Sequence, residues 1–151
     1  MRRKDREMPE EFGRAIIDLC NYGVAAMTDE EGAPYAVALN MVRDGNALYF
    51  HCAAGGRKAE ALNRDPRVCI VFVGSEQPQR DKFTTLYESA VVRGRAVQVE
   101  DAAEKIRALR LLCEKLTPTN MPNFDEAVER SLSRTAVWRV DIDEITAKKK
   151  G

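Results

Sequence analysis

The sequence predicts a mainly β protein with flanking helices, folded as a small barrel or a half-closed sheet. Several short strand-like segments follow one another, and turn signals such as Asp44-Gly45 between them favour antiparallel hairpins. A much longer strand-like segment covers residues 84–99 and contains Gly94, where a bend or bulge would let the sheet curve. Antiparallel strands with one bent long strand are typical of small barrels, whereas doubly wound folds alternate strands with helices.

Length and charge narrow the class of protein further. With 151 residues the chain is expected to form one domain, residues 1–151, large enough to bury a core without disulfides. Its 24 basic and 24 acidic residues cancel, which argues against a nucleic-acid partner because such a partner needs a patch of one sign. No apolar run approaches the roughly 20 residues that span a bilayer, and the N-terminus is charged rather than signal-like. We therefore expect a cytoplasmic protein that does not associate with a membrane.

The cysteines and the single histidine give no pattern of metal ligands. The four cysteines are scattered and form no C-x-x-C pair, so we expect buried thiols in a reducing cytosol: Cys20, Cys52, Cys69 and Cys113. One histidine without clustered ligands also argues against a zinc site. We expect no metal site.

The chain begins with a predicted helix and two strands. Residues 9–20 are expected to be helical, because Pro9 suits the first turn and apolar residues recur on one stripe from Phe12 to Cys20. A short strand over 24–28 and an acidic turn then lead to a second strand over 34–42. The second strand has unequal faces, with large apolar side chains on one side that should fill a core: Tyr35, Val37, Leu39 and Met41. The other face carries two alanines and Asn40, which leaves room for a flat molecule with Asn40 as a polar contact.

Residues 52–58 place a glycine turn between a predicted strand and the start of a helix. Arg57 and Lys58 open this helix directly after Gly55 and Gly56. The opening of a helix presents unpaired N–H groups and a partial positive charge. Two cations there, after glycines that let a ligand approach the backbone, make a suitable phosphate site. A solvated turn with two surface cations fits the same spacing, so the residues alone leave both interpretations open.

His51 lies at the end of the strand that precedes this turn. The two-residue period of a strand puts Tyr49 and His51 on one face and Cys52 on the other, so His51 is expected to point away from the core. The same parity argues against a His51–Cys52 pair of base and nucleophile. A lone histidine is often structural or merely exposed, but the place of His51 beside the glycine turn equally favours a contact with a ligand.

The remaining elements are predicted from apolar patterns and capping signals. Asp101 with Glu104 three residues later is a capping-box pattern that starts a helix. In chain order we expect a strand covered on both faces over 68–73, a loop over 74–83, the long strand over 84–99, a helix over 101–116, a loop over 117–122, a helix from an Asn123 cap to about residue 131, and a strand over 135–142.

Taken together, these segments resemble the FMN-binding split-barrel superfamily of pyridoxamine 5′-phosphate oxidase relatives, and within it the nitroimidazole-resistance (Nim-type) proteins. The resemblance covers nearly the whole chain. It is carried by MRRKDREM, YGVAAMTDEEGAPYAVALN, LYFHCAAGGRKAEALNRDPRVC, KFTTLYESAVVRGRA and WRVDIDEITAKKK, in this order. It implies a split β-barrel and a homodimer with two FMN molecules at the subunit interface.

The resemblance also implies roles for individual residues. Arg57 and Lys58 would hold the FMN phosphate. His51 would lie beside the flavin as the candidate catalytic residue, since the matching histidine is regarded as functionally important in Nim-type proteins. The other implied cofactor contacts are Leu39 and Asn40 at the isoalloxazine ring, and Tyr87 to Ser89 at the phosphate or ribityl chain, with Tyr87 and Ser89 as the candidates.

The expected function is that of an FMN-dependent reductase. It would take electrons from NADH or NADPH and pass them to a small acceptor such as a nitro-aromatic; the alternative is a flavin carrier, store or sensor without turnover. The chain ends in lysines and has no histidine after His51, which argues against pyridoxamine phosphate oxidation and against the haem-degrading branch. Some branches of this fold take a deazaflavin, so the sequence leaves FMN and deazaflavin open.

Overall fold

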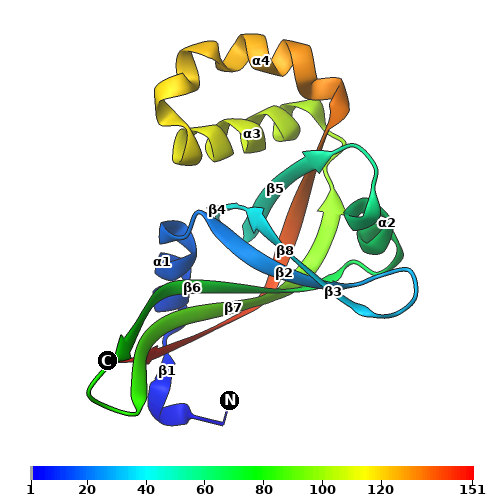
Figure 1. Cartoon of the computed structure of the whole chain (residues 1–151). Helices are drawn as coiled ribbons and strands as arrows, with labels where there is room; N and C mark the ends of the chain where they lie inside the picture. The colour runs from blue at the N-terminus through cyan, green and yellow to red at the C-terminus, as the bar shows by residue number, and fades with distance from the viewer. Residues whose placement is uncertain (1) are drawn as a thin grey trace.

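A computed structural model, which describes residues 2–151, shows a curled antiparallel sheet with helices at its flanks (Figure 1). The strands are β1 (Glu7–Met8), β2 (Tyr22–Thr28), β3 (Pro34–Asn40), β4 (Val42–Asp44), β5 (Ala47–Ala53), β6 (Arg67–Gln79), β7 (Thr84–Gln98) and β8 (Thr135–Lys150). The helices are α1 (Glu10–Leu19), α2 (Arg57–Arg64), α3 (Ala102–Leu116) and α4 (Phe124–Ser131), with 3-10 turns η1 (Lys4–Arg6), η2 (Pro118–Asn123) and η3 (Leu132–Arg134).

The strands form a split β-barrel. Their order is β3-β2-β6-β7-β8-β5-β4, with β1 added beside β8, and the pairings among them are antiparallel. Strand β3, at one end of this order, also approaches β5 near the other end, so the sheet curls back on itself. The predicted fold class, a mainly β barrel with flanking helices, is confirmed.

Gly94 marks the bend of the long strand, as the sequence predicts. The register between β7 and β8 shifts between Arg93 and Gly94. A Cβ atom added at Gly94 would lie 2.4 Å from the backbone oxygen of Asp141. Glycine is therefore required here because the backbone of the neighbouring strand approaches too closely for any side chain.

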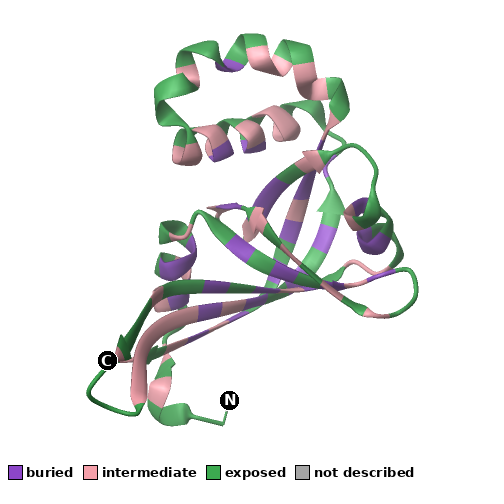
Figure 2. Cartoon of the chain, in the orientation of Figure 1, coloured by how far each residue is buried: buried purple, intermediate pink, exposed green. Residues whose placement is uncertain are grey.

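The main core fills the inside of the barrel, and a smaller cluster lies outside it. Large side chains such as Trp138, Phe50 and Phe72 are fully buried in the interior. Helices α3 and α4 form a separate layer above the end of β5, and Figure 2 shows buried residues on the side of α3 that faces the sheet. The outer cluster is Val42, Tyr49, Val99, Ala108, Leu112 and Val137. Tyr49 is therefore buried, although it is on the outward face of β5.

Strand β6 corrects two predictions. The expected loop over 74–83 is instead strand as far as Gln79, because β7 supplies pairing partners along this whole length. Pro78 is tolerated since β6 pairs with β2 only through Cys69–Val71, so that its distal half lies at an edge. The run over 68–73 is covered on one face only: Val71 and Val73 are 39% and 57% exposed.

Strand β8 extends to Lys150 instead of ending near residue 142. The lysines belong to the strand because they pair with Tyr87–Ser89 of β7, and Lys149 contacts Glu88 at 2.8 Å. The buried Ala147 alternates with these more exposed lysines. The predicted strand over 34–42 is likewise corrected, since β3 ends at Asn40 and β4 begins at Val42.

The helix caps agree only in part with the prediction. Asp101 accepts the N–H of Glu104 at 2.8 Å, but the Glu104 carboxylate does not complete a capping box, because it binds Tyr49 and Arg139. Asn123 does not cap α4; its amide donates to another side chain, and the expected loop before it is the 3-10 turn η2.

The four cysteines are free and half-buried, not fully buried as expected. Within residues 2–151, no helix is long and apolar enough to cross a membrane.

Candidate functional site

The glycine turn between β5 and α2 is open to solvent. Gly55 and Gly56 have φ angles of 82° and 91°, in the left-handed region that favours glycine. A Cβ atom added at either would meet nothing within 4 Å. Gly56 is the N-cap of α2, and it provides no side-chain hydrogen bond to the helix. The first N–H groups of α2 are therefore available to an acceptor from outside.

Arg57 is held beside this turn by two contacts. Its Nη2 donates to Oδ2 of Asp29 at 3.0 Å, and its guanidinium lies 4.7 Å from the centre of the Tyr35 ring. Asp29 is buried, and N–H groups of Ala33 and Glu31 together with Arg57 lower the pKa of its carboxyl against the opposing effect of burial. The Arg57 side chain remains 56% exposed, so its other N–H donors can reach a ligand. The sequence reasoning missed Asp29, although Asp29-Glu30-Glu31-Gly32 is a recognisable turn.

Lys58 and Cys52 lie close together at the same turn. Burial raises the pKa of the Cys52 thiol, and the ammonium group of Lys58 opposes this shift. Lys58 is half-buried, whereas Arg57 is exposed. The two cations at the start of α2 therefore differ in exposure, and Lys58 is near enough to Cys52 to act on its thiol.

His51 lies at the end of β5, outside the barrel core, as the strand period predicts. It is exposed, whereas Phe50 before it is buried in the core. Side chains of α3 and α4 approach it, and the resulting desolvation lowers the pKa of His51 below 6.5. The neutral imidazole is consequently the dominant form at pH 7.

Leu39 and Asn40 end β3, whose two faces differ as the sequence predicts. Leu39 is half-buried and packs against the main core. Asn40 is exposed, and its Nδ2 donates to the backbone oxygen of Asn21 at 3.0 Å. The outward face of β3 carries the exposed Ala36 and Ala38, so a flat, small-residue surface precedes Asn40.

Tyr87 and Ser89 lie at the other end of the sheet. Ser89 pairs with Val73, which is six residues along β6 from Arg67, the first residue of this strand; Figure 1 shows α2 on the far side of the molecule from the turn that joins β6 and β7. At about 3.3 Å per residue this separation is roughly 20 Å. The hydroxyl of Tyr87 accepts a hydrogen bond from Arg6 at 3.2 Å, which lowers the pKa of Tyr87. Within one chain the structure does not bring these two residues to Arg57 and Lys58.

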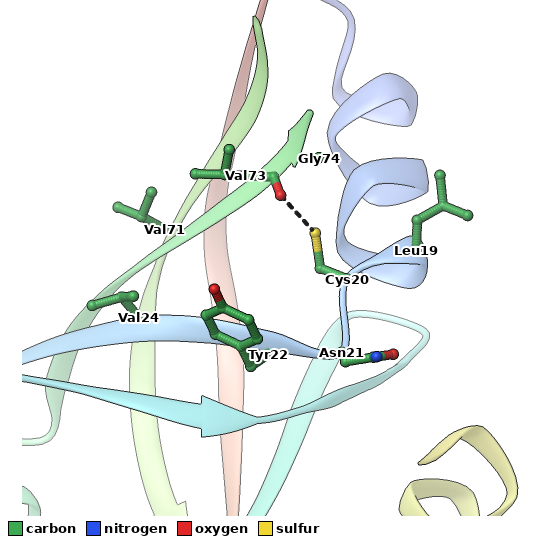
Figure 3. Close-up of a pocket in the computed structure, with 8 residues that line it drawn as sticks. All are labelled: Leu19, Cys20, Asn21, Tyr22, Val24, Val71, Val73 and Gly74. Carbon is green, nitrogen blue, oxygen red and sulfur yellow. Dashed lines mark hydrogen bonds between the residues drawn. The ribbon is translucent and has the colours of Figure 1, made fainter. Parts of the chain in front are cut away.

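An exposed apolar hollow, which the sequence reasoning missed, lies between the end of α1 and strands β2 and β6 (Figure 3). Its volume is about 560 Å³, and Leu19, Tyr22 and Val73 on it are 81%, 57% and 57% exposed. The apolar run over 68–73 was the signal that could have located it. Its lining, here called the β2–β6 face, is Leu19, Cys20, Asn21, Tyr22, Val24, Val71, Val73 and Gly74.

The fold and this geometry define a split-barrel protein with an open, basic glycine turn outside the barrel. Comparison with family models identifies the family. The model described as pyridoxamine 5′-phosphate oxidase matches residues 13–149, so the chain belongs to that family. A comparison with curated proteins finds no match.

Solved structures of similar fold include flavin-related proteins. A "putative 5-nitroimidazole antibiotic resistance protein" from Bacteroides thetaiotaomicron is 27% identical, with a TM-score of 0.78 over 95% of this chain and 86% of that one. The FAD and haem binding protein from Mycobacterium smegmatis is 19% identical, with a TM-score of 0.76 over 90% and 69%. The flavocytochrome Anf3 from Azotobacter vinelandii is 22% identical, with a TM-score of 0.74 over 95% and 68%. The resemblance to the oxidase-related split barrels and their nitroimidazole-resistance members is confirmed.

Proposed function

We propose that this chain is an FMN-binding reductase that passes electrons from NADH or NADPH to a small acceptor such as a nitro-aromatic. The observation that carries the proposal is the uncapped start of α2, with Arg57 and Lys58 beside an open glycine turn. The similarity to proteins described as a flavocytochrome and as an FAD and haem binding protein also supports a flavin. The similarity to a nitroimidazole-resistance protein supports the acceptor class.

The residues at the start of α2 fit a terminal phosphate. The N–H groups of the first turn and the partial positive charge of the helix favour an anion. Arg57 uses one nitrogen on Asp29 and keeps further donors for phosphate oxygens, while Lys58 adds a second charge. Gly55 and Gly56 leave the approach clear, because no neighbouring atom lies where a Cβ would be.

The outward face of β3 fits the isoalloxazine ring, with Leu39 and Asn40 at its border. Bound flavin would supply the redox chemistry, accepting two electrons from a nicotinamide and passing them on. His51, neutral at pH 7, can donate a hydrogen bond to the acceptor and orient it. We assign His51 as the catalytic residue on this basis.

The β2–β6 face is proposed as the interface of a homodimer. Apolar side chains this exposed over one contiguous surface are unusual for a monomer, and the face is self-complementary if a two-fold axis crosses it. Ser89 is the cross-strand partner of Val73, so it lies at the edge of this face. Dimerisation would thus let Tyr87 and Ser89 of one chain contact FMN bound at Arg57 and Lys58 of the other, which their own chain does not allow.

Anaerobic rapid mixing tests the function. The protein reconstituted with FMN is mixed with NADH or NADPH, and the flavin absorbance is followed; nitrobenzene is then added. Bleaching by the nicotinamide followed by reoxidation with nitrobenzene is the expected result. Flavin that binds but is never bleached by either donor contradicts the reductase and assigns the chain to the non-catalytic flavin carriers, stores or sensors.

A further inference from the structure

The turn that joins β6 and β7, residues 80–83, is a cationic surface with one exposed aromatic ring and is here called the arm tip. The N–H of Lys82 donates to the backbone oxygen of Gln79 at 3.0 Å, so the turn has a defined shape. Phe83 is fully exposed, and Arg80 and Lys82 are exposed beside it. Asp81 leaves the arm tip with one net positive charge, and no carboxylate of residues 2–151 forms an ion pair with Arg80 or Lys82. The arm tip therefore suits a partner that offers carboxylates and a small apolar surface.

The turn between β2 and β3, residues 29–32, carries the opposite charge and is here called the acidic turn. Glu30 and Glu31 are exposed, and in the described part of the chain neither pairs with a basic side chain. Asp29 is already paired with Arg57 at 3.0 Å, so the charge left on the acidic turn is that of two glutamates. Pro34, which begins β3, is exposed close by in the chain. The acidic turn and Pro34 thus offer two carboxylates and an apolar ring.

The arm tip and the acidic turn lie at opposite ends of the sheet, as Figure 1 shows, and at similar distances from the β2–β6 face. Along β6, Val73 on this face is seven residues from Arg80. In the other direction Val71 is opposite Val24. Glu30 is six residues beyond Val24, which places it eight residues from Val73 along the sheet. At about 3.3 Å per residue the two separations are roughly 23 Å and 26 Å.

Charge favours one way of pairing two copies of the chain through the β2–β6 face. A face that packs on its own copy requires a two-fold axis in the plane between the two chains. An axis along the strands would place arm tip beside arm tip and acidic turn beside acidic turn, and like charges facing each other are unfavourable. An axis across the strands near Val73 places each arm tip beside the acidic turn of the other chain, because both are about equally far from Val73. Opposite charges then meet at both ends of the dimer.

We propose that the arm tip of each chain binds the acidic turn of a second copy of this chain. The two cations of the arm tip pair with Glu30 and Glu31, and Phe83 packs on Pro34. This arm contact rests on the proposed dimer through the β2–β6 face, and it fixes how the two chains are oriented. The acidic turn also supplies the carboxylate that holds Arg57, so the arm of one chain secures the phosphate site of the other.

Charge reversal tests the arm contact, with dissociation of the dimer followed by light scattering over a dilution series of the full chain, with and without FMN. The tip variant carries Arg80→Glu and Lys82→Glu, and the turn variant carries Glu30→Lys and Glu31→Lys. In a dimer of either variant, like charges would meet at both ends. We therefore expect the dissociation constant of each to rise at least tenfold.

Mixing the two variants should restore the dimer. In a dimer of one tip variant and one turn variant, each arm tip again meets an acidic turn of opposite charge, so the mixture should dimerise as the original protein does. A chain with all four reversals should do the same. The matched control reverses two exposed arginines near the end of α4, at the opposite end of the molecule from the arm tip: Arg130→Glu with Arg134→Glu should leave the dissociation constant unchanged. Phe83→Ala should raise the dissociation constant without any change of charge.

The outcomes separate the arm contact from the proposed function. Tip and turn variants that dimerise as tightly as the original protein overturn the arm contact and leave the dimer through the β2–β6 face standing. Weakened variants that neither mixing nor the fourfold reversal restores also overturn the arm contact. An original protein that is monomeric at every concentration overturns both the arm contact and the dimer. Weakening and restoration as expected, in a protein without affinity for FMN, overturn the reductase function and support the arm contact.

Discussion

Replacing Arg57 and Lys58 together by alanine tests the phosphate site most sharply. A hydrogen bond to a charged group contributes about 1.5–3 kcal/mol. Because the Arg57 side chain is 56% exposed, we take the lower end for both contacts, a total of about 3 kcal/mol. That corresponds to roughly a hundredfold weaker binding of FMN. Riboflavin, which lacks the phosphate, should bind the variant as it binds the original protein.

The assay is quenching of flavin fluorescence on titration with protein. Arg64→Ala, in the last turn of the same helix, is the matched control and should leave both affinities unchanged. The double variant should remain folded, because Asp29 keeps its two backbone hydrogen bonds when Arg57 is removed. An equal loss of affinity for FMN and riboflavin would refute the assignment of these two cations to the phosphate.

Three further predictions concern the histidine, the interface and the sheet. His51→Ala should leave FMN binding intact but slow the reoxidation of reduced flavin by nitrobenzene. Because the pKa of His51 is lowered, the reoxidation rate of the original protein should change at a pH below 6.5, whereas the rate of the variant should not. A variant that keeps this pH dependence contradicts the role of His51. Val73→Asp should give monomers in light scattering and bind FMN much more weakly. The control Val97→Asp, at the far end of β7, should remain a dimer. If both variants are dimers, the β2–β6 face is not the dimer interface. Gly94→Ala should lower the free energy of unfolding by about 1–3 kcal/mol in urea denaturation, because the Cβ of the alanine would meet the Asp141 backbone. An unchanged denaturation midpoint would show that β7 and β8 can move apart at no cost.

The parts of the fold set by local patterns could be predicted from the sequence. The glycine turn and helix α2 follow from residues that are adjacent in the chain. The outward position of His51 and the unequal faces of β3 follow from the two-residue period of a strand. Gly94 indicates the bulge because glycine weakens a strand interior, and it is therefore typical of bulges and of places where another backbone approaches closely.

The parts that depend on distant partners could not be predicted. Residues 74–79 and the final lysines are polar, so their sequence indicates loop, yet β7 pairs with both and makes them strand. Tyr49 was expected to be outside the core, and a helix more than 50 residues later covers it. Asp29 joins the site only because folding brings it to Arg57. The prediction that residues 68–73 are covered on both faces was wrong, because Val71 and Val73 are exposed although the run is apolar throughout.

The central claim, that the chain binds FMN in a dimer, is tested most directly by one titration. The purified protein is titrated with FMN, the absorbance spectrum of the bound flavin is recorded, and the mass of the complex is measured by light scattering. We expect saturation at one FMN per chain and a mass of two chains with two flavins. A protein that binds no FMN at micromolar concentration, or that binds it as a monomer, would contradict the account.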